Sequence, residues 1–318
     1  MKTLHFDCSA GISGDMALGA LVDLGVNPDT LRRELEKLGL SGWDLEFFSD
    51  QRGGITGTHA VVNLHGQIDH IAADDDAPDH GGHSHEHTHD GLTHSHAHGE
   101  TGHTHEHTHG EAGHDHEHHH NSWREIRGVI EASGISAGAK KRALDIFTRI
   151  AQAESQVHGT TADEVTFHEV GALDSIIDIV GTAIGLDLLR PDRITCGEIE
   201  LGGGMVKCAH GLLPVPAPAT LILVQGLPVT TGGFNKEMTT PTGAAILAAS
   251  VDEFITQGHF REIKTGYGIG TRKMERPNLL RLSLREEGAP EGVEQPWKTE
   301  DLVLLETNID DMTGEALG

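Results

Sequence analysis

The chain has 318 residues, of which 36% are hydrophobic, and a formal net charge of −26 from 49 acidic and 23 basic residues. This length favours about two domains. The excess of acidic residues repels nucleic acid and anionic membranes, so these are not expected partners, and it attracts divalent cations. Three cysteines without a CxxC pair exclude a disulfide framework.

No segment has the pattern of a signal peptide or a membrane span. The N-terminus, MKTLHFDCSAG, lacks an apolar h-region. The most apolar run, SIIDIVGTAIGLDLL, contains Asp178 and Asp187 and is too short and too charged to cross a bilayer. We therefore expect a cytoplasmic protein.

Residues 1–70 predict an N-terminal α/β unit. Its predicted elements are a strand at 2–7, helices at 14–25 and 28–39, and a hairpin of strands at 43–48 and 58–64. The helices follow from the helical spacing of their apolar residues, and Asn27 followed by Pro28 is a typical helix start. The hairpin follows from period-two alternation on both sides of the glycine-containing DQRGG.

Residues 71–121 predict a disordered insertion rich in histidine. Between His80 and His120 lie 17 of the 25 histidines, mostly two residues apart. Neutral imidazole suits nickel, copper and zinc, and affinity order alone cannot choose among them. A passive linker or a purification tag is the alternative, although the tract is internal and mixed with other residues. The predicted metal ligands are His83, His85, His87, His89, His94, His96, His98, His103, His105, His107, His109, His114, His116, His118, His119 and His120.

Residues 122–287 predict a second α/β unit, the core domain. Its predicted elements are helices capped by Ser122 and Ser136, a strand at 164–168, a helix at 172–189, a strand at 193–201, a helix entered through LPVPAPATLILVQG, a helix at 240–250 and a strand at 278–286. Strands that alternate with helices indicate a mixed α/β (α+β) fold.

The last residues predict a linker at 288–299 and a strand with half a helix at 300–318. Such a pair cannot bury a core alone. Either it packs on the preceding domain or it begins a ferredoxin-like α+β domain of a longer protein, and the second interpretation is favoured.

The stretch TFHEVGALDSIIDIVG carries four residues with catalytic potential. Asp174 and Asp178 are four residues apart and share a helix face bordered by isoleucines. A carboxylate there is costly unless it is paired or binds a cation. His168 and Glu169 precede the helix and could converge on the same site. The alternatives are a favourable helix-dipole position for Asp174 and a buried salt bridge to an arginine for Asp178.

The glycine-containing loop DCSAGISGDM lies between the first strand and the first helix. Loops at the carboxyl ends of strands often bind anions or substrates. Cys8 in this loop is a candidate soft ligand or nucleophile, but a lone cysteine is more often a small buried hydrophobic residue.

Two further loops carry candidate ligands. Cys208 and His210 are two residues apart and could hold a soft metal, although two residues do not complete a site. Arg272, Lys273 and Arg276 lie beside glycines and suggest a phosphate cradle; a tight hairpin with exposed basic residues explains them equally well.

Six stretches resemble, in order, those of the LarC-type nickel-insertion proteins. They are DCSAGISGDMALGALVDLGV, HEVGALDSIIDIVG, HGLLPVPAPATL, TPTGAAIL, GYGIGTR with RPNLLR, and ETNIDDMTGE. The resemblance implies a nickel chelatase of the lyase class that inserts Ni²⁺ into pyridinium-3,5-bisthiocarboxylic acid mononucleotide. It also implies CTP hydrolysis supported by Mg²⁺ or Mn²⁺, and a lactate racemase-type enzyme as recipient of the nickel-pincer cofactor.

The resemblance also singles out residues of this sequence. The motif positions are Asp7, Cys8, Ser13, Asp15, His168, Glu169, Asp174, Asp178, His210, Asp310 and Asp311. The catalytic candidates among them are Asp15, His168, Glu169, Asp174, Asp178 and His210, and a carboxylate or His168 is the candidate general base. Arg272 and Lys273 are the candidate residues for binding a phosphate-bearing cofactor. Family members continue beyond DDMTGE, so a separate C-terminal polypeptide is a candidate partner for CTP binding.

Two other functions remain open. The first is a nickel store or metallochaperone whose activity lies in the histidine tract. The second is a metal-dependent nucleotide hydrolase. A protein that only stores nickel does not require six further motifs with candidate ligands and catalytic residues outside the tract. The chelatase is therefore the favoured interpretation.

Overall fold

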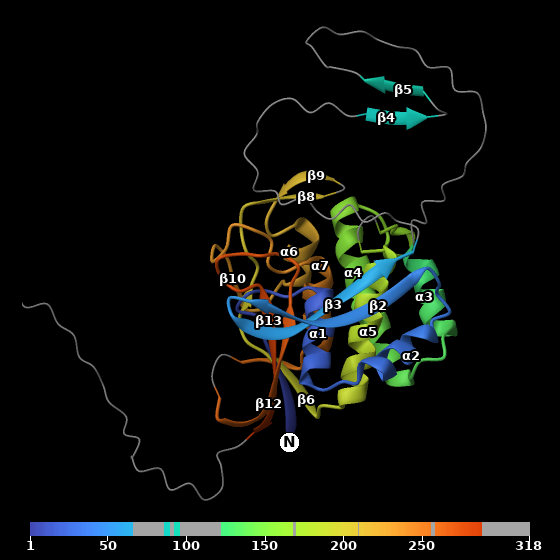
Figure 1. The fold of residues 1–318 in the computed structure, drawn as a ribbon. Helices are drawn as coiled ribbons and strands as arrows, with labels where there is room; N and C mark the ends of the chain where they lie inside the picture. Colours follow the sequence, from blue (N-terminus) through green and yellow to red (C-terminus); the bar gives the residue numbers. More distant parts are fainter. Residues whose placement is uncertain are drawn as a thin grey trace, which may run out of the picture.

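A seven-stranded mixed sheet forms the centre of this computed structural model (Figure 1). The structure describes residues 1–65, 86–89, 92–95, 122–167, 170–208, 210–255 and 258–287. In spatial order the strands are β11 (Glu253–Phe254), β6 (Arg193–Cys196), β1 (Lys2–Asp7), β13 (Leu279–Glu287), β12 (Phe260–Ile269), β3 (Ile55–Leu64) and β2 (Trp43–Arg52). β1 runs parallel to β6 and antiparallel to β13.

Helix α1 (Gly14–Leu24) packs directly on the sheet, against β3, β12 and β13. Glycines permit this close approach. A Cβ at Gly268 of β12 would lie 1.8 Å from the Met16 carbonyl oxygen, and a Cβ at Gly19 would lie 2.3 Å from the Thr58 carbonyl oxygen. The strand glycines of GYGIG therefore serve the contact between strand and helix.

The other helices extend the core away from the sheet (Figure 1). They are α2 (Pro28–Glu36), α3 (Trp123–Ala132), α4 (Ala137–His158), α5 (Leu173–Leu189), α6 (Pro218–Leu223) and α7 (Pro241–Ser250). Helix α5 lies against α1, α2 and α4, and α4 also contacts α6 and α7. Residues 176–186 of α5 are buried except at 178, as expected for a helix with apolar side chains on most faces.

The mixed α/β fold predicted from the sequence is confirmed. The hairpin of β2 and β3 forms, Ser122 and Glu125 form a capping box at α3, and the Asn27 side chain caps α2 by accepting from Thr30 N. The strand predicted at 164–168 is wrong: a short 3₁₀ helix (Ala162–Glu164) ends there, and Thr166 makes only an isolated bridge to Ser122.

The strand predicted at 193–201 divides into two. β6 ends at Cys196, and β7 (Ile199–Glu200) leaves the large sheet to pair with β10 (Val229–Thr230). Two further strands, β8 (Met205–Cys208) and β9 (Gly211–Pro214), form a separate antiparallel hairpin. The chain therefore turns away from the sheet after β6, and this change of direction opens space between the hairpin and the helices.

The segments predicted as the N-terminal unit and the core domain share the large sheet. β1 lies between β6 and β13, and β3 lies beside β12. The domain boundaries at residues 70 and 122 remain a prediction. Strands from both predicted units belong to the same sheet. Within the part of the chain that the structure describes, no helix has both the length and the apolar character required to cross a membrane.

The structure describes the backbone of two short segments of the histidine tract. β4 (Glu86–His89) and β5 (Leu92–Ser95) pair antiparallel, with His87 opposite His94. The rest of the insertion, the linker predicted at 288–299 and the ferredoxin-like start predicted at 300–318 lie outside the described residues.

Candidate functional site

A cavity of about 590 Å³ lies between α4, the β8–β9 hairpin and the N-terminal ends of α5, α6 and α7. This volume is within the usual range of about 300–1,000 Å³ for small-molecule sites. Among the described residues, the ionisable side chains that line it are Glu154, His158, Lys207, Cys208, His210, Glu237 and Arg272.

Helix starts supply part of the lining of the cavity. Thr240, which caps α7 by accepting from Gly243 N, lines the cavity together with Pro241 and Thr242. Ser175, in the first turn of α5, also lines it. The positive end of the helix dipole at these helix starts favours an anionic group such as phosphate.

Two histidines face each other in the cavity. The ring centroids of His158 and His210 are 4.9 Å apart, with the ring planes tilted by 39°. His158 is the last residue of α4, and its Nε2 lies 3.3 Å from a carboxylate oxygen of Glu154, one turn earlier. His210 lies in the turn of the β8–β9 hairpin, across which Cys208 pairs with Gly211.

Cys208 and His210 thus line one cavity, and His158 and Glu154 line it with them. The soft-metal role of Cys208 and His210 remains a prediction. The sequence signal for Glu154 and His158 was their i, i+4 spacing at a helix end, which allows a carboxylate to orient an imidazole. Among the residues that the structure describes, no group of three histidine, cysteine or acidic side chains is arranged to hold a metal ion.

Arg272 reaches the cavity, whereas Lys273 is not among its lining residues. Arg272 Nη1 donates to the Glu237 carbonyl oxygen, and Nη2 lies 4.0 Å from the Glu237 carboxylate. Both basic residues are exposed in the loop that joins β12 to β13. The hairpin interpretation of this stretch is therefore correct, and Arg272 in addition faces the cavity.

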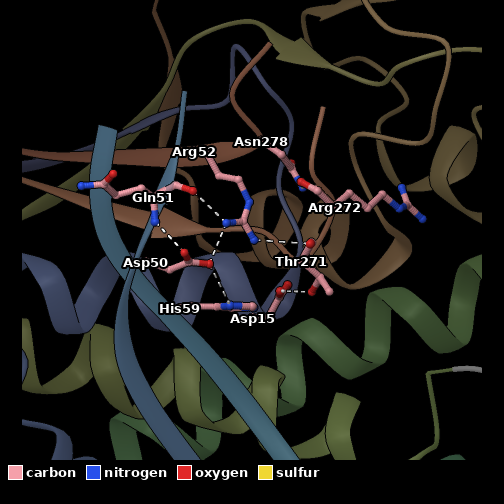
Figure 2. A network of polar contacts seen from close by, with 8 residues as sticks. All are labelled: Asp15, Asp50, Gln51, Arg52, His59, Thr271, Arg272 and Asn278. Carbon is pink, nitrogen blue, oxygen red and sulfur yellow. Dashed lines mark hydrogen bonds and ion pairs between the residues drawn. The ribbon is translucent and has the colours of Figure 1, made fainter. Parts of the chain in front are cut away.

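Asp15 belongs to a polar network beside this loop (Figure 2). Its carboxylate accepts from the Ser13 hydroxyl and from Thr271 Oγ1, the latter at 3.5 Å. The Thr271 carbonyl accepts from Arg52 Nη2 at 3.3 Å, so both the start of α1 and the end of β2 hold this loop. Arg52 is itself paired with Asp50, with Nη1 2.6 Å from the carboxylate.

His59 of β3 joins the same network (Figure 2), and the sequence analysis did not identify it. Its Nδ1 lies 3.8 Å from Asp50 Oδ2, and it is 8% exposed. Burial lowers the pKa of His59; the charge of Asp15 opposes this and that of Arg52 adds to it. The imidazole is therefore neutral in the folded protein near pH 7.

Asp174 and Asp178 have different environments. Asp174 is exposed in the first turn of α5, and its Oδ1 accepts from Ser175 N at 2.7 Å, consistent with the helix-dipole interpretation. Asp178 Oδ1 is buried without a hydrogen-bond partner. Burial raises the pKa of Asp178 well above its usual range, and the charges of Asp15 and Asp174 raise it further.

The salt-bridge interpretation of Asp178 is wrong within the described residues. The charged groups that act on its carboxyl are those of Asp15 and Asp174, and the carboxyl accepts a hydrogen bond from the backbone N–H of Asp15. Neither Asp15 nor Asp178 is among the residues that line the 590 Å³ cavity. Asp178 thus supports the start of α1.

Cys8 is fully buried, with its Sγ 3.8 Å from Cys196 Sγ. Burial raises the pKa of the Cys8 thiol well above its ordinary value. Because the thiolate is the reactive form, the structure favours the buried hydrophobic role over the nucleophile. His168 and Glu169 lie outside the described residues, and so do the side chains of the sixteen predicted metal ligands in the tract.

Comparisons with known proteins agree with the motifs. The model of the nickel insertion protein family matches residues 4–318. A putative nickel insertion protein of Wolinella succinogenes is 45% identical and is matched over 100% of this chain and 67% of its own length. A pyridinium-3,5-bisthiocarboxylic acid mononucleotide nickel insertion protein of Clostridium acetobutylicum is 48% identical, over 100% of this chain and 70% of its own.

A putative nickel insertion protein of Maridesulfovibrio salexigens is 49% identical, with 100% of this chain and 70% of its own length covered. No solved structure matches the chain. The family match over almost the whole chain, together with these relatives, shows that the chain belongs to the nickel insertion protein family.

Proposed function

We propose that this chain inserts Ni²⁺ into pyridinium-3,5-bisthiocarboxylic acid mononucleotide and so forms a nickel-pincer cofactor. The observation that carries the proposal is the cavity that His158, His210 and Cys208 line together with residues at the starts of α5 and α7. It combines ligands for a borderline metal with a wall suited to phosphate. The names of relatives in the family support this choice of substrate.

The substrate's phosphate would bind at the helix starts, near Arg272 and Lys207. Both side chains line the cavity, and a charge-assisted hydrogen bond to an anion contributes about 1.5–3 kcal/mol. The pyridinium ring and its two thiocarboxylates would then bind near the imidazoles of the same cavity.

Insertion requires the loss of one ring proton. The electron pair of the ring C–H bond becomes the nickel–carbon bond, the two thiocarboxylate sulfurs bind the same nickel, and the proton passes to a general base. Glu154 and Glu237 are the described carboxylates in the cavity. His168 and Glu169 remain candidate bases from the sequence, whereas Asp15, Asp174 and Asp178 are better suited to supporting α1 and α5.

CTP, with Mg²⁺ or Mn²⁺, belongs to the proposal through the family resemblance. Arg272 and Lys273 do not line one cavity together, because Lys273 is outside the cavity lining, so a triphosphate cradle made by both is not part of the proposal. The insertion steps above therefore use only residues of the cavity. The proposed recipient of the product is a lactate racemase-type enzyme, and the proposed location is the cytoplasm.

The histidine tract is proposed to concentrate nickel for the cavity. Many closely spaced imidazoles can bind several nickel ions and so raise the local concentration of the metal. A nickel store without catalysis is the second candidate, and the tract itself favours it.

The test compares the full chain with a variant that lacks residues 80–120. Each is supplied with nickel, the bisthiocarboxylated mononucleotide and magnesium, with and without CTP, and the product is followed by mass spectrometry. We expect product from both proteins, with the variant requiring more free nickel. No product from either, with nickel still bound by the full chain, would support the store instead.

A further inference from the structure

A second cavity, of about 540 Å³, lies at the carboxyl ends of three parallel strands of the large sheet. Ser9 follows β1, Glu198 follows β6 and Ile255 follows β11, and all three residues line it. In open α/β sheets, ligands bind in the crevice outside the carboxyl ends of the strands. Among the described residues, this cavity shares no lining residue with the 590 Å³ cavity, so it is a separate candidate site.

A buried polar side chain faces this second cavity. His5 of β1 is 8% exposed and lines the cavity. Its Nδ1 lies 2.9 Å from the hydroxyl of Thr195, which is fully buried. Its Nε2 lies beside Gly197, where an added Cβ would be 3.9 Å from it, and Gly197 also lines the cavity. Within the described residues Nε2 has no hydrogen-bond partner, so this edge of the ring is available to a ligand.

Three carboxylates line the cavity among the described residues, and two of them are already engaged by the protein. Asp7 is paired with Arg281, and both oxygens of the buried Glu200 accept hydrogen bonds from the protein. Glu198 is exposed and has no ion pair in the part of the chain that the structure describes. Its carboxylate is therefore available to a positively charged group.

The guanidinium of Arg276 is held at the cavity by two contacts. Its Nη1 donates to the Gly233 carbonyl oxygen at 3.0 Å, and its Cζ lies 4.3 Å from the centroid of the Phe234 ring. No carboxylate of the described ranges forms an ion pair with it, so its Nε and Nη2 remain available to an anion. Arg276 and Glu198 thus bring opposite charges to one cavity without pairing with each other.

A smaller cavity, of about 250 Å³, adjoins the second one, because Asp7, Ser9 and Arg276 line both. Apart from Arg281, which is paired with Asp7, its other described lining residues are apolar or aromatic. They are Ala10, Ile55, Phe234, Tyr267, Pro277 and Leu279. The smaller cavity therefore suits an apolar or aromatic group attached to a polar ligand in the larger one.

We propose that these two adjoining cavities bind a zwitterion, an α-amino acid with an apolar or aromatic side chain. Its ammonium group binds Glu198 and its carboxylate binds Arg276, both through charge-assisted hydrogen bonds. His5 Nε2 supplies a further hydrogen bond to the polar end of the ligand, and the side chain enters the smaller cavity. A purely cationic ligand would meet Arg276 and a purely anionic one would meet Glu198, so a ligand with both charges binds best. The site is independent of the proposed nickel insertion.

The experiment uses the full chain, with EDTA present so that no amino acid binds through nickel on the histidine tract. Dissociation constants are measured by ligand-observed NMR at about pH 6, where α-amino groups are protonated. The probes are L-phenylalanine, L-phenylalaninamide without the carboxylate, 3-phenylpropionate without the ammonium group, and L-alanine without the ring. L-phenylalanine should bind most tightly, and each of the others should bind about tenfold or more weakly, because each lacks one charged or apolar contact.

Glu198→Gln and Arg276→Met each remove one charge at an exposed position. Both should weaken binding of L-phenylalanine about tenfold or more. Glu198→Gln should not weaken 3-phenylpropionate, which has no ammonium group, and Arg276→Met should not weaken L-phenylalaninamide, which has no carboxylate. The matched controls are Glu275→Gln and Lys273→Met, because both residues are exposed in the loop that carries Arg276 and lie outside the cavity linings. They should bind every probe as the unaltered chain does.

Three outcomes would overturn the amino-acid site. The first is equal affinity for all four probes, or no detectable binding of L-phenylalanine. The second is weakening of every probe by both variants, which would show a general disturbance of the cavity and contradict the assigned contacts. The third is weakening of L-phenylalanine by Arg272→Met but not by Arg276→Met, because Arg272 lines the other cavity and the ligand would then bind there.

Discussion

Gly14, the first residue of α1, lies directly against Asp178 of α5: a Cβ added to Gly14 would be 2.6 Å from Asp178 Cβ and Oδ2. The next residue, Asp15, donates its backbone N–H to the Asp178 carboxyl. Ser13, at the N-cap position, makes no side-chain cap. Asp178 therefore satisfies the start of α1 from a neighbouring helix, and only glycine leaves room for it.

Substitution of Gly14 by alanine should destabilise the fold. The new methyl group would force α1 away from α5, and overpacking of this kind costs about 1–3 kcal/mol. The control is Gly128→Ala in α3, where an added Cβ meets nothing within 4 Å. That change should raise the free energy of unfolding by about 0.5–1 kcal/mol, because alanine is the better helix former. Urea unfolding of both variants measures the difference, and equal shifts would contradict the contact.

Asp178→Asn should stabilise the protein increasingly as the pH rises. Burial raises the pKa of Asp178 in the folded protein, while in the unfolded chain it is about 3.9. Between these values the folded state binds more protons, so the unaltered chain loses stability as pH increases. Asparagine does not titrate and retains an acceptor for the Asp15 N–H.

The measurement is the difference in unfolding free energy between the two proteins from about pH 4 to pH 8. A difference that stays constant over this range would show that the carboxyl is not buried as described. In the insertion assay, full activity of Asp178→Asn would also remove this residue from the candidate bases.

The pairing of Gly14 with Asp178 shows what the sequence could and could not predict about the site. Both motifs were identified, and the apolar surroundings of Asp178 indicated its burial. The partner could not be predicted, because a backbone N–H supplied by another helix leaves no residue-type signal. His158 was missed for a different reason: its i, i+4 spacing from Glu154 is common on helices, and its place beside His210 depends on a hairpin turn 52 residues later.

For the fold, periodicity predicted α1 and the β2–β3 hairpin, and the long apolar run predicted α5 as a buried helix. It did not predict that β1 lies between β6 and β13, since strand order depends on contacts between distant segments. The strand predicted at 193–201 divides because Glu200 is buried and accepts from Gly202 N and Thr230 Oγ1, which holds the chain in a turn away from the sheet.

Arg272→Met and Lys273→Met form a matched pair in the insertion assay. Arg272 lines the cavity and Lys273 does not. Loss of a charge-assisted contact to the substrate's phosphate should raise KM about 10-fold or more for Arg272→Met, with little change in kcat because the phosphate is bound equally before and during insertion. Lys273→Met should leave both constants unchanged. Equal effects of the two substitutions would argue for general attraction by the loop and against a specific contact.

His5→Gln should make the fold less sensitive to acid. His5 of β1 is 8% exposed, and its Nδ1 lies 2.9 Å from Thr195 Oγ1. The pKa of His5 is lowered to about 4, mainly by burial and also by Arg285 and Arg281 of β13, while Asp7 of β1 and Glu262 of β12 act in the opposite direction.

In the unfolded chain the pKa of a histidine is about 6.5, so the unfolded state binds more protons between this value and the folded value of about 4. The unaltered chain should therefore lose up to roughly 3 kcal/mol of stability from this group as pH falls through that window. Glutamine can still bond to Thr195 but does not titrate, so His5→Gln should lack this part of the slope. The exposed His259→Gln is the control and should retain it. Unfolding free energies measured at intervals across the window provide the comparison, and an identical slope in His5→Gln would mean that His5 is already charged in the folded protein.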